Sequence, residues 1–341
     1  MPQGLLKVAG SIDLNQFWPR GESDADTTKI LVSVGGNAFQ YRPNATAAFQ
    51  ATHAFDQAKV RGKVTKPCID NKSRVTVRLQ GIDAPELHYM PQAAKKKADQ
   101  TKKQRERFLE LNEKYRQKLG ETATVELSSL LQQAGQDPLP CTVVTAVDHP
   151  SDVFDTYARF VGNILVTIGA QDVNVNNWLV EQGWAFPTFY TSMSDAEIEE
   201  LRTKWEAGKN VANRVGKKLH RFVRMKDFNW ELIYRGKGAV PEPETDRGPV
   251  VMPKLFRRLC VWAVNSKAGM ITGNFQKYLV TTKDEFHLTD DFLEQGAAAA
   301  EVRTLDEFID QNGKFRLTPD EMVFREKPSR LIGPDGQPVN W

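Results

Sequence analysis

The chain has 341 residues and carries 46 Lys and Arg against 43 Asp and Glu, a formal net charge of +3. Its 40% hydrophobic and 26% charged residues match the mix of ordinary globular proteins, which excludes a collagen-like, low-complexity or wholly disordered chain. At roughly 100–200 residues per domain, the length predicts about two domains. No apolar run approaches the roughly 18–20 residues of a membrane span, so no membrane contact is expected.

The N-terminal sequence MPQGLLKVAGSIDL lacks the basic flank and apolar core of a signal peptide. Cys68, Cys141 and Cys260 are odd in number and widely spaced, so they predict neither a disulfide framework nor a CxxC metal site. Ordinary thiols in a reducing compartment fit this pattern. We therefore expect a cytoplasmic protein, with an export signal trimmed upstream as the alternative.

Five strands are predicted in the first half of the chain. The first 35 residues predict two strands around a turn-rich loop, and residues 73–82 alternate like a third, half-buried strand. Residues 36–72 have no clean periodicity and are interpreted as an insertion of uncertain structure. Two further strands are predicted at residues 141–147 and 159–168.

Residues 91–131 are expected to be helical, and much of this stretch is basic. Residues 91–120 hold ten Lys and Arg against four Asp and Glu, a local net charge of +6 that exceeds the charge of the whole chain. Clustered cations bind backbone phosphates by releasing counterions, which makes Lys95, Lys96 and Lys97 candidate substrate contacts. A solubilising helix face is the alternative.

Two helices are expected later, a short one in VNVNNWLVEQG and a longer one after Ser194, whose spacing to Glu197 predicts a capping box. Apolar or small residues of the longer helix recur every three or four positions and form a packing stripe. The stripe consists of Ile198, Leu201, Trp205, Gly208, Ala212, Val215 and Leu219.

The C-terminal part carries no motif that indicates chemistry. Residues 236–253 hold four prolines and three glycines and predict a linker or a long loop at a boundary. Beyond them, LFRRLCVWAV predicts a helix or a strand, TLDEFIDQ an acidic helix, and GPDGQP a hairpin turn.

Three segments place charged residues where strands begin or end. They are DADT at residues 24–27, RLQGIDAPE at 78–86 and DTYAR at 155–159. Asp83 starts the opposite face as its strand ends, and the proline between the two carboxylates helps Glu86 to project near Asp83.

Together the three segments supply carboxylates and guanidiniums. Ca²⁺ and Mg²⁺ bind carboxylate, carbonyl and water oxygens, and arginine pairs bidentately with phosphate oxygens. A free carboxylate beside metal-bound water can orient that water or accept its proton. Each fragment alone is a weak signal, but the inventory suits phosphodiester hydrolysis.

The order and spacing of these segments resemble the staphylococcal nuclease (thermonuclease) family. DADT is similar to the family's D-G-D-T, VRLQGIDAPE to R-L-x-x-[IV]-D-[TA]-P-E, and DTYAR to D-x-Y-G-R, while GAQDVNVNNWLVEQGWA resembles the turn and helix that follow. The resemblance spans residues 5–219. It implies an α+β fold with a five-stranded OB-fold β-barrel and three helices, plus a C-terminal accessory region.

The implied domain organisation has three parts. They are an SNase-like nuclease domain at residues 1–220, with an insertion at 36–72 and an extended basic helix at 91–131, a connecting segment at 221–253, and an accessory region of unknown function at 254–341.

The resemblance also implies a metal site. Asp26 and Asp83 would be metal ligands, joined by the backbone carbonyl of Ala84, and Glu86 would orient or deprotonate the attacking water. The cofactor of the family is Ca²⁺, with Mg²⁺ or Mn²⁺ as alternatives.

The implied substrate contacts are cationic and aromatic. Arg78 and Arg159 would hold the phosphate and neutralise the charge that develops on it, and Tyr157 would help to hold a terminal phosphate. The implied activity is metal-dependent cleavage of DNA, RNA or both, with the 5′-oxygen as the leaving group.

Several positions depart from the family pattern. Glycines become Ala25 and Ala158, a threonine becomes Ala84, and a lysine before the tyrosine becomes Thr156; Phe189 stands where the family often has tyrosine. These departures bear on end-binding and substrate preference more than on catalysis.

Two alternatives stay open at this stage. FDQAKV, residues 55–60, lies a family-like distance before Arg78 but lacks the second aspartate, so DADT fits better at the cost of a long insertion. The alternative function is a catalytically inactive SNase-like module that binds nucleic acid or protein, and a protein partner is possible through the C-terminal region.

Overall fold

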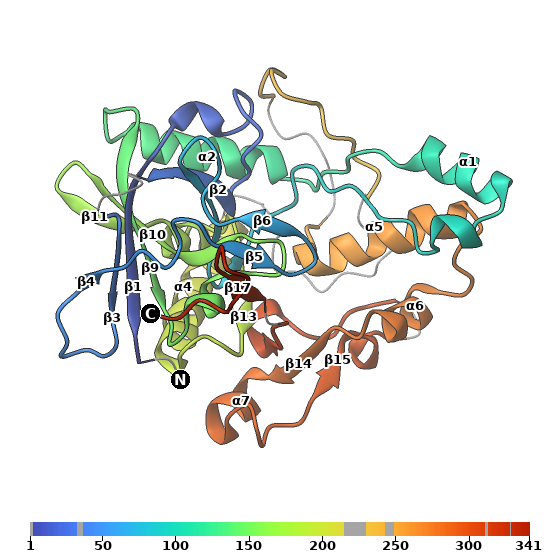
Figure 1. Ribbon diagram of the computed structural model, residues 1–341. Coiled ribbons are helices and arrows are strands. Elements are labelled where there is room, and N and C mark those ends of the chain that lie inside the picture. The colour runs from blue at the N-terminus through green and yellow to red at the C-terminus, as the bar shows by residue number, and fades with distance from the viewer. Residues whose placement is uncertain (1–2, 33–36, 215–229, 243–248, 311–312, 328) are drawn as a thin grey trace.

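The computed structural model describes residues 3–32, 37–214, 230–242, 249–310, 313–327 and 329–341. Five strands close into a mixed barrel in the order β1 (Leu5–Ile12), β2 (Thr27–Val32), β7 (Arg74–Leu79), β10 (Phe160–Ile168) and β9 (Leu139–Ala146). Each strand pairs with the next, β9 pairs back with β1, and only the β7–β10 pair is parallel (Figure 1). The five predicted strands and the α+β barrel fold are therefore confirmed.

The period of two along each barrel strand explains why these segments close around one core. Leu6 and Val8 of β1, Ile30 of β2, Val77 of β7 and Val143 of β9 are all 0% exposed. Branched aliphatic side chains at alternate positions fill the interior, so the barrel is a packed core rather than a pore.

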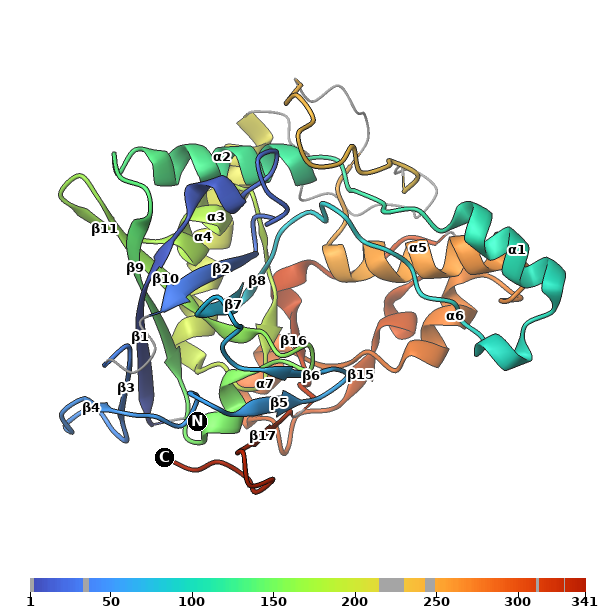
Figure 2. The same cartoon turned by 45° about the horizontal axis from the view of Figure 1, so that its top comes forward.

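Three helices accompany the barrel, as predicted. α2 (Gly120–Gln132) lies across one end of the barrel, above β2 (Figure 2), and α3 (Val175–Glu181) packs against α4 (Asp195–Arg214). The capping box that begins α4 is confirmed, because the Ser194 hydroxyl accepts from the Glu197 amide and the Glu197 carboxylate accepts from the Ser194 amide. Val215 and Leu219 of the predicted stripe lie outside the described residues, as does the predicted domain end at residue 220.

The prediction of one extended basic helix over residues 91–131 is wrong. Residues 91–101 form a loop with a single 3₁₀ turn (Lys97–Asp99), α1 spans Lys102–Leu111, and an extended segment separates it from α2. A Thr101–Gln104 capping box begins α1. Tyr89 and Tyr115 exchange two backbone hydrogen bonds of 2.8 Å, which keeps the segment after α1 extended. Tertiary pairing outweighs helix propensity here.

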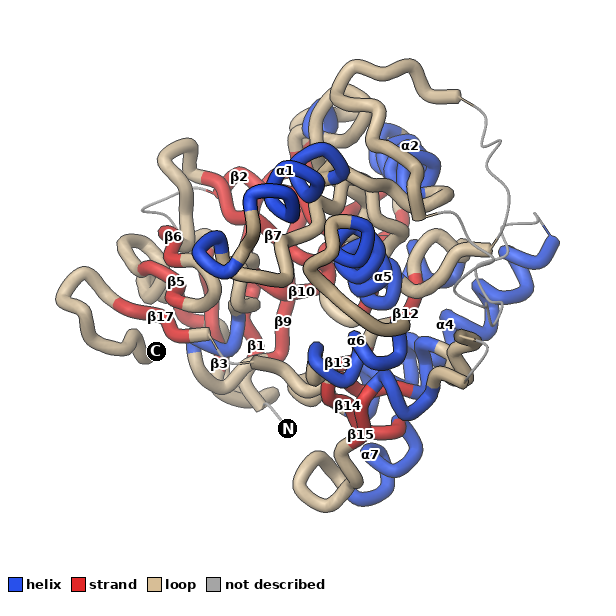
Figure 3. Tube along the Cα trace, turned by 90° about the vertical axis from the view of Figure 1, so that its right-hand side faces the viewer, coloured by secondary structure: helices blue, strands red, loops and turns tan. Residues whose placement is uncertain are grey.

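The insertion forms two β-pairs. In one, β3 (Phe39–Arg42) pairs with β1 and with β4 (Gln50–Ala51). In the other, β5 (Lys59–Arg61) pairs with β6 (Thr65–Pro67) and also with β17 (Arg330–Ile332), close to the C-terminus (Figure 3). The insertion therefore connects the barrel to the last strand of the chain.

The remaining strands are short. β8 (Ile82–Asp83) pairs with β12 (Phe186–Pro187), and β11 (Gln171–Asn174) pairs antiparallel with β10. Four strands from two regions form a further sheet, in the order β13 (Phe189–Tyr190), β16 (Met322–Phe324), β14 (Glu285–Leu288) and β15 (Arg303–Thr304).

The C-terminal region contributes α5 (Pro253–Lys267), α6 (Phe275–Thr282) and α7 (Thr289–Gln295). LFRRLCVWAV is thus a helix, and the predicted turn at GPDGQP is confirmed by the Gly333 amide donating to the Gln337 carbonyl at 2.8 Å. The acidic helix predicted in TLDEFIDQ is wrong where it is described: Leu305–Phe308 is a 3₁₀ turn, and Asp310 instead accepts from the Lys314 amide.

The C-terminal region packs against the barrel domain. Trp205 of α4 is 0% exposed and its indole donates to Asp320 at 2.9 Å. Hydrophobic residues of both regions form one continuous core. The boundaries at residues 220 and 253 remain a prediction. Over the described residues, no helix has both the length and the apolarity to cross a membrane.

Asn176 of α3 provides a test of how the barrel and helices are joined. It is 0% exposed, accepts from the Ile164 amide at 3.1 Å and donates to the Gln80 carbonyl at 2.9 Å. Asn176→Ala leaves both backbone groups buried without this partner, so we expect a loss of about 3 kcal/mol in the free energy of unfolding, measured by urea denaturation. Asn177→Ala, at the more exposed neighbouring position, is the control and should cost less than about 1 kcal/mol.

Candidate active site

The site begins where β7 ends and the chain turns into β8. Gly81 has φ +73, a left-handed conformation that favours glycine. The turn brings Asp83 back beneath β7, where Arg78 Nη2 donates to Asp83 Oδ1 at 2.8 Å. A local turn therefore pairs two predicted site residues.

Asp26 joins this pair from the neighbouring strand. The register aligns Thr27 with Arg78, and the Arg78 Nη1 atom lies 3.6 Å from Asp26 Oδ1. Asp26 Oδ2 accepts from the Ala84 amide at 3.0 Å, and Oδ1 accepts from the Thr27 hydroxyl at 2.9 Å. The first and second charged segments thus meet at one end of the barrel, as the motif order predicted.

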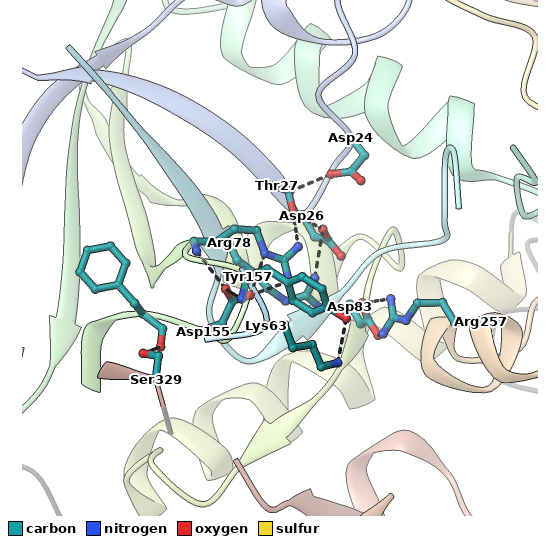
Figure 4. Close-up of polar contacts among 12 residues, drawn as sticks. Asp24, Asp26, Thr27, Lys63, Arg78, Asp83, Asp155, Tyr157, Arg257 and Ser329 are labelled. Atoms are coloured by element: carbon teal, nitrogen blue, oxygen red, sulfur yellow. Dashed lines mark hydrogen bonds and ion pairs between the residues drawn. The ribbon is translucent and has the colours of Figure 1, made fainter. Parts of the chain in front are cut away.

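A third guanidinium reaches the same carboxylates from α5. Arg257 Nη2 donates to Asp83 Oδ2 at 2.8 Å, and Arg257 Nη1 contacts Asp83 Oδ1 at 3.3 Å and also Glu86 Oε1. Figure 4 shows Arg257 reaching Asp83 from the C-terminal helix. The Glu86 amide donates to the Gln117 side chain at 3.0 Å, which fixes the backbone at this residue.

Burial and pairing with arginine shift the pKa values of these acids in opposite directions. Burial alone would raise the pKa of Asp83, but Arg257 and Arg78 outweigh it and hold that pKa well below its usual range. Burial raises the pKa of Glu86 despite Arg257, with the charges of Asp83 and Asp26 adding to the effect. Glu86 therefore holds its proton more readily than Asp83, which fits a carboxylate that accepts a proton.

The DTYAR segment lies beside this cluster through Thr27. Arg159 Nη1 donates to the Thr27 hydroxyl at 3.3 Å, while Arg159 Nε donates to Asp155 Oδ2 at 2.7 Å. Ala158 has φ +62, a conformation that costs an alanine roughly 1–2 kcal/mol. Asp155 Oδ1 stabilises the turn by accepting from the amides of Tyr157 and Arg159, both at 2.9 Å.

The insertion adds a cation that sequence reasoning missed. Lys63, at the tip of the β5–β6 hairpin, donates from Nζ to the Tyr157 hydroxyl at 2.9 Å (Figure 4). Its amide donates to the Thr156 carbonyl at 2.8 Å, and a Cβ on Gly62 would lie 2.6 Å from that same oxygen. Lys63 thus brings an ammonium group to the segment where Thr156 replaces the lysine of the family pattern.

The two alternative segments, DADT and FDQAKV, lie in different parts of the fold. DADT precedes β2 and meets the DAPE turn, whereas FDQAKV lies in the insertion, with Phe55 and Val60 buried in the core and Asp56 Oδ2 3.0 Å from His53 Nδ1. Lys95, Lys96 and Lys97 lie on the loop before α1 rather than on a helix, and Lys96 and Lys97 are exposed. These three lysines are not placed in the network of Asp26, Asp83 and Glu86.

Arg257 was missed because nothing local connects it to the motifs. The available local signal is the pair of adjacent arginines in the apolar run LFRRLC. Phe256 and Leu259 beside them are 0–1% exposed, and the two arginine side chains are only 24% and 31% exposed, which favours pairing with acids. Arg258 pairs with Asp284, with two contacts of 2.6 Å, and Arg257 pairs with the site. Which arginine takes which acid depends on the tertiary fold.

The donor set is chemically suited to a hard divalent cation. Asp26 and Asp83 offer carboxylate oxygens, and the Asp26–Ala84 hydrogen bond places Asp26 against the Asp83–Ala84 backbone. Within the part of the chain that the structure describes, no group of three or more His, Cys, Asp or Glu side chains is arranged to hold a metal ion. Two carboxylates would therefore need the Ala84 carbonyl and water to complete a coordination shell.

Comparison with known families identifies part of the chain. Residues 76–213 match a family described as Staphylococcal nuclease homologue. The match includes Arg78, Glu86 and Arg159 but begins after Asp26, and it covers less than half of the 341 residues. A search of curated proteins finds no match.

Arg78 is the central cation of the site, and its removal tests the pairing. Arg78→Met leaves Asp26 and Asp83 short of a partner in a buried position, so we expect a loss of about 3 kcal/mol in the free energy of unfolding in urea. Because the folded pKa of Asp83 is lowered, its pairing stabilises the fold above about pH 4, and the difference from wild type should shrink as the pH falls further.

Arg74→Met is the matched control, on the same strand. Arg74 and its partner Asp70 are each 34% exposed, so the same substitution should cost less than about 1 kcal/mol. Equal losses in the two variants would contradict the proposed importance of the buried pairing.

Proposed function

Residues 76–213 form an SNase-like domain, and from this premise we propose that the chain is a nuclease that hydrolyses phosphodiester bonds of DNA, RNA or both. The observation that carries the proposal is the convergence of Asp26, Asp83 and Glu86 with Arg78 at one end of the barrel. Three acids and a guanidinium from two segments, DADT and RLQGIDAPE, meet at this point, and this set of groups suits phosphodiester hydrolysis.

Asp26, Asp83 and the Ala84 carbonyl are the residues that would hold a divalent cation. Ca²⁺ is the typical cofactor of this family, and Mg²⁺ or Mn²⁺ would accept the same oxygen donors. When bound, such an ion lowers the pKa of a coordinated water and polarises the phosphoryl oxygen.

The chain's own residues would perform the remaining steps. Glu86 orients the attacking water and takes its proton, which suits a carboxylate whose pKa is raised by burial. Arg78 and Arg159 donate to the phosphoryl oxygens and stabilise the added negative charge. The bond to the 5′-oxygen breaks, and this oxygen takes a proton from solvent.

Tyr157 and Lys63 would form a phosphate-binding element beside the reacting group. The ammonium group of Lys63 lies 4.7 Å from the centre of the Tyr157 ring and donates to its hydroxyl, and Tyr157 is 48% exposed. An exposed cation at the tip of a hairpin is suited to a phosphate that enters from solvent. Lys95, Lys96 and Lys97 stay candidates for weaker, more distant backbone contacts.

The second candidate function is a catalytically inactive module that binds nucleic acid or protein. The pairing of Arg257 with Asp83 and Glu86 favours it, because those acids are neutralised within the protein itself. Incubating plasmid DNA and RNA with Ca²⁺, Mg²⁺ or a chelator separates the two functions. Cleavage that needs the metal supports the enzyme, and absence of cleavage under every condition supports the module.

Glu86→Gln and Arg159→Ala test the catalytic roles. General-base and electrostatic groups each contribute about 10²–10⁴-fold, so each variant should lose at least about 100-fold in kcat/KM with metal present. Circular dichroism and thermal unfolding should show a folded protein in both cases.

Arg74→Ala is the matched control for Arg159→Ala. Arg74–Asp70 and Arg159–Asp155 are both aspartate–arginine pairs four residues apart, but only the second touches the site. Arg74→Ala should keep wild-type activity. Full activity in Glu86→Gln would refute the proposed mechanism.

Lys63→Gln tests the phosphate contact. If the ammonium group neutralises one substrate phosphate, KM should rise with little change in kcat. The slope of log binding constant against log salt concentration, measured with an oligonucleotide, should become shallower by about one. Lys66→Gln removes an exposed lysine from β6 of the same hairpin and should change neither KM nor the salt dependence of binding. An unchanged KM in Lys63→Gln would exclude Lys63 from substrate binding.

A further inference from the structure

Arg257 uses both of its terminal nitrogens on the proposed catalytic acids. Nη2 lies 2.8 Å from Asp83 Oδ2, Nη1 lies 3.3 Å from Asp83 Oδ1, and Nη1 also pairs with Glu86 Oε1. Arg78 donates to Asp83 Oδ1 from the other side. Both oxygens of Asp83 therefore already accept from positively charged donors.

The helix that carries Arg257 is held in place on both sides of it. Phe256 and Leu259 are buried in the core, and Asn265, further along the helix, accepts from the Ala94 amide at 2.8 Å and donates to the Gln92 carbonyl at 2.9 Å. These contacts join α5 to the loop that follows the DAPE turn at residues 83–86. Arg257 is thus supplied by a fixed element rather than by a loose segment.

A second contact ties the start of α5 to Glu86. The Gln117 side chain accepts from the Glu86 amide at 3.0 Å and donates to the Val251 carbonyl, two residues before the helix, at 2.8 Å. The spacing between Glu86 and the N-terminal end of α5 is therefore fixed through one buried amide. This geometry keeps the Arg257 side chain at the carboxylates.

A guanidinium in this position opposes a divalent cation. An ion bound by Asp26 and Asp83 must use an Asp83 oxygen that accepts from Arg257, and it would lie within a few ångströms of a like charge in a poorly solvated site. Arg257 supplies the positive charge that these acids otherwise take from the ion. The ion and the guanidinium therefore compete for one carboxylate.

We propose that Arg257 is an internal counter-ion that competes with the divalent cation for Asp83 and Glu86, so that the C-terminal region sets the cation affinity of the site. This inference rests on the proposed function in taking Asp26 and Asp83 as the metal ligands. The metal-bound state requires the Arg257 side chain to move off Asp83, while the helix that carries it stays docked.

Calorimetric titration of the full-length chain with Ca²⁺ tests the proposal without any measurement of cleavage. Arg257→Gln keeps a side chain of similar length without the charge, and it should bind Ca²⁺ at least about tenfold more tightly than wild type. Arg257→Lys keeps the charge but loses the contact made by two nitrogens, and its Ca²⁺ affinity should lie between those of wild type and Arg257→Gln. Arg257→Lys also carries the test if Arg257→Gln fails to fold.

Arg258→Gln is the matched control, since it removes the same charge from the next position of the same helix. Arg258 pairs with Asp284, so its loss should leave the Ca²⁺ affinity unchanged. Thermal unfolding with and without Ca²⁺ gives a second readout: Ca²⁺ should raise the Tm of Arg257→Gln more than that of wild type.

An Arg257→Gln protein whose Ca²⁺ affinity equals or falls below that of wild type would overturn the proposal. That result is expected if Arg257 instead positions the metal ligands or contacts the phosphate. Failure of the proposed function is a separate outcome: if neither wild type nor variant cleaves DNA or RNA, the nuclease proposal fails, while the titration still decides the competition.

Discussion

A carboxylate with 1% of its side chain exposed must be paired or lose its charge, and Asp83 is in that position. Its two partners come from very different places in the chain. Arg78 precedes it by five residues on the same turn, whereas Arg257 follows it by 174 residues. The turn supplies the first pairing locally. The second exists only when α5 is docked, which makes the C-terminal region part of the environment of the site.

The insertion also brings a cation to the site through contacts with a distant part of the chain. The β5–β6 hairpin is held by β17, near the C-terminus, and presents Lys63 to Tyr157. Two segments outside the barrel strands thus each deliver a cation, one to the carboxylates and one to the DTYAR turn. Both depend on contacts between parts of the chain that are far apart in sequence.

Local patterns were sufficient for the strands, whereas their closure into a barrel was implied only by the family resemblance. Alternation predicts the strand at residues 73–82, apolar and β-branched runs predict the other four, and the turn chemistry of DAPE predicts that Glu86 projects near Asp83. Arg257 and Lys63 could not be assigned this way, because their partners are fixed by long-range packing. The prediction of one helix over residues 91–131 was wrong for a related reason. The backbone of Tyr115 pairs with that of Tyr89, and helix propensity contains no information about such a distant partner.

The strained turn at Ala158 bears on the choice between an enzyme and an inactive module. The family pattern has glycine there, and alanine keeps the left-handed conformation, with φ +62, at an energetic cost. Asp155 offsets this cost with two hydrogen bonds to the turn and pairs directly with Arg159. If the conformation served no purpose, a relaxed turn without glycine-like geometry would be more stable. Because strain of this kind persists mainly where it positions a functional group, the retained geometry favours a working role for Arg159.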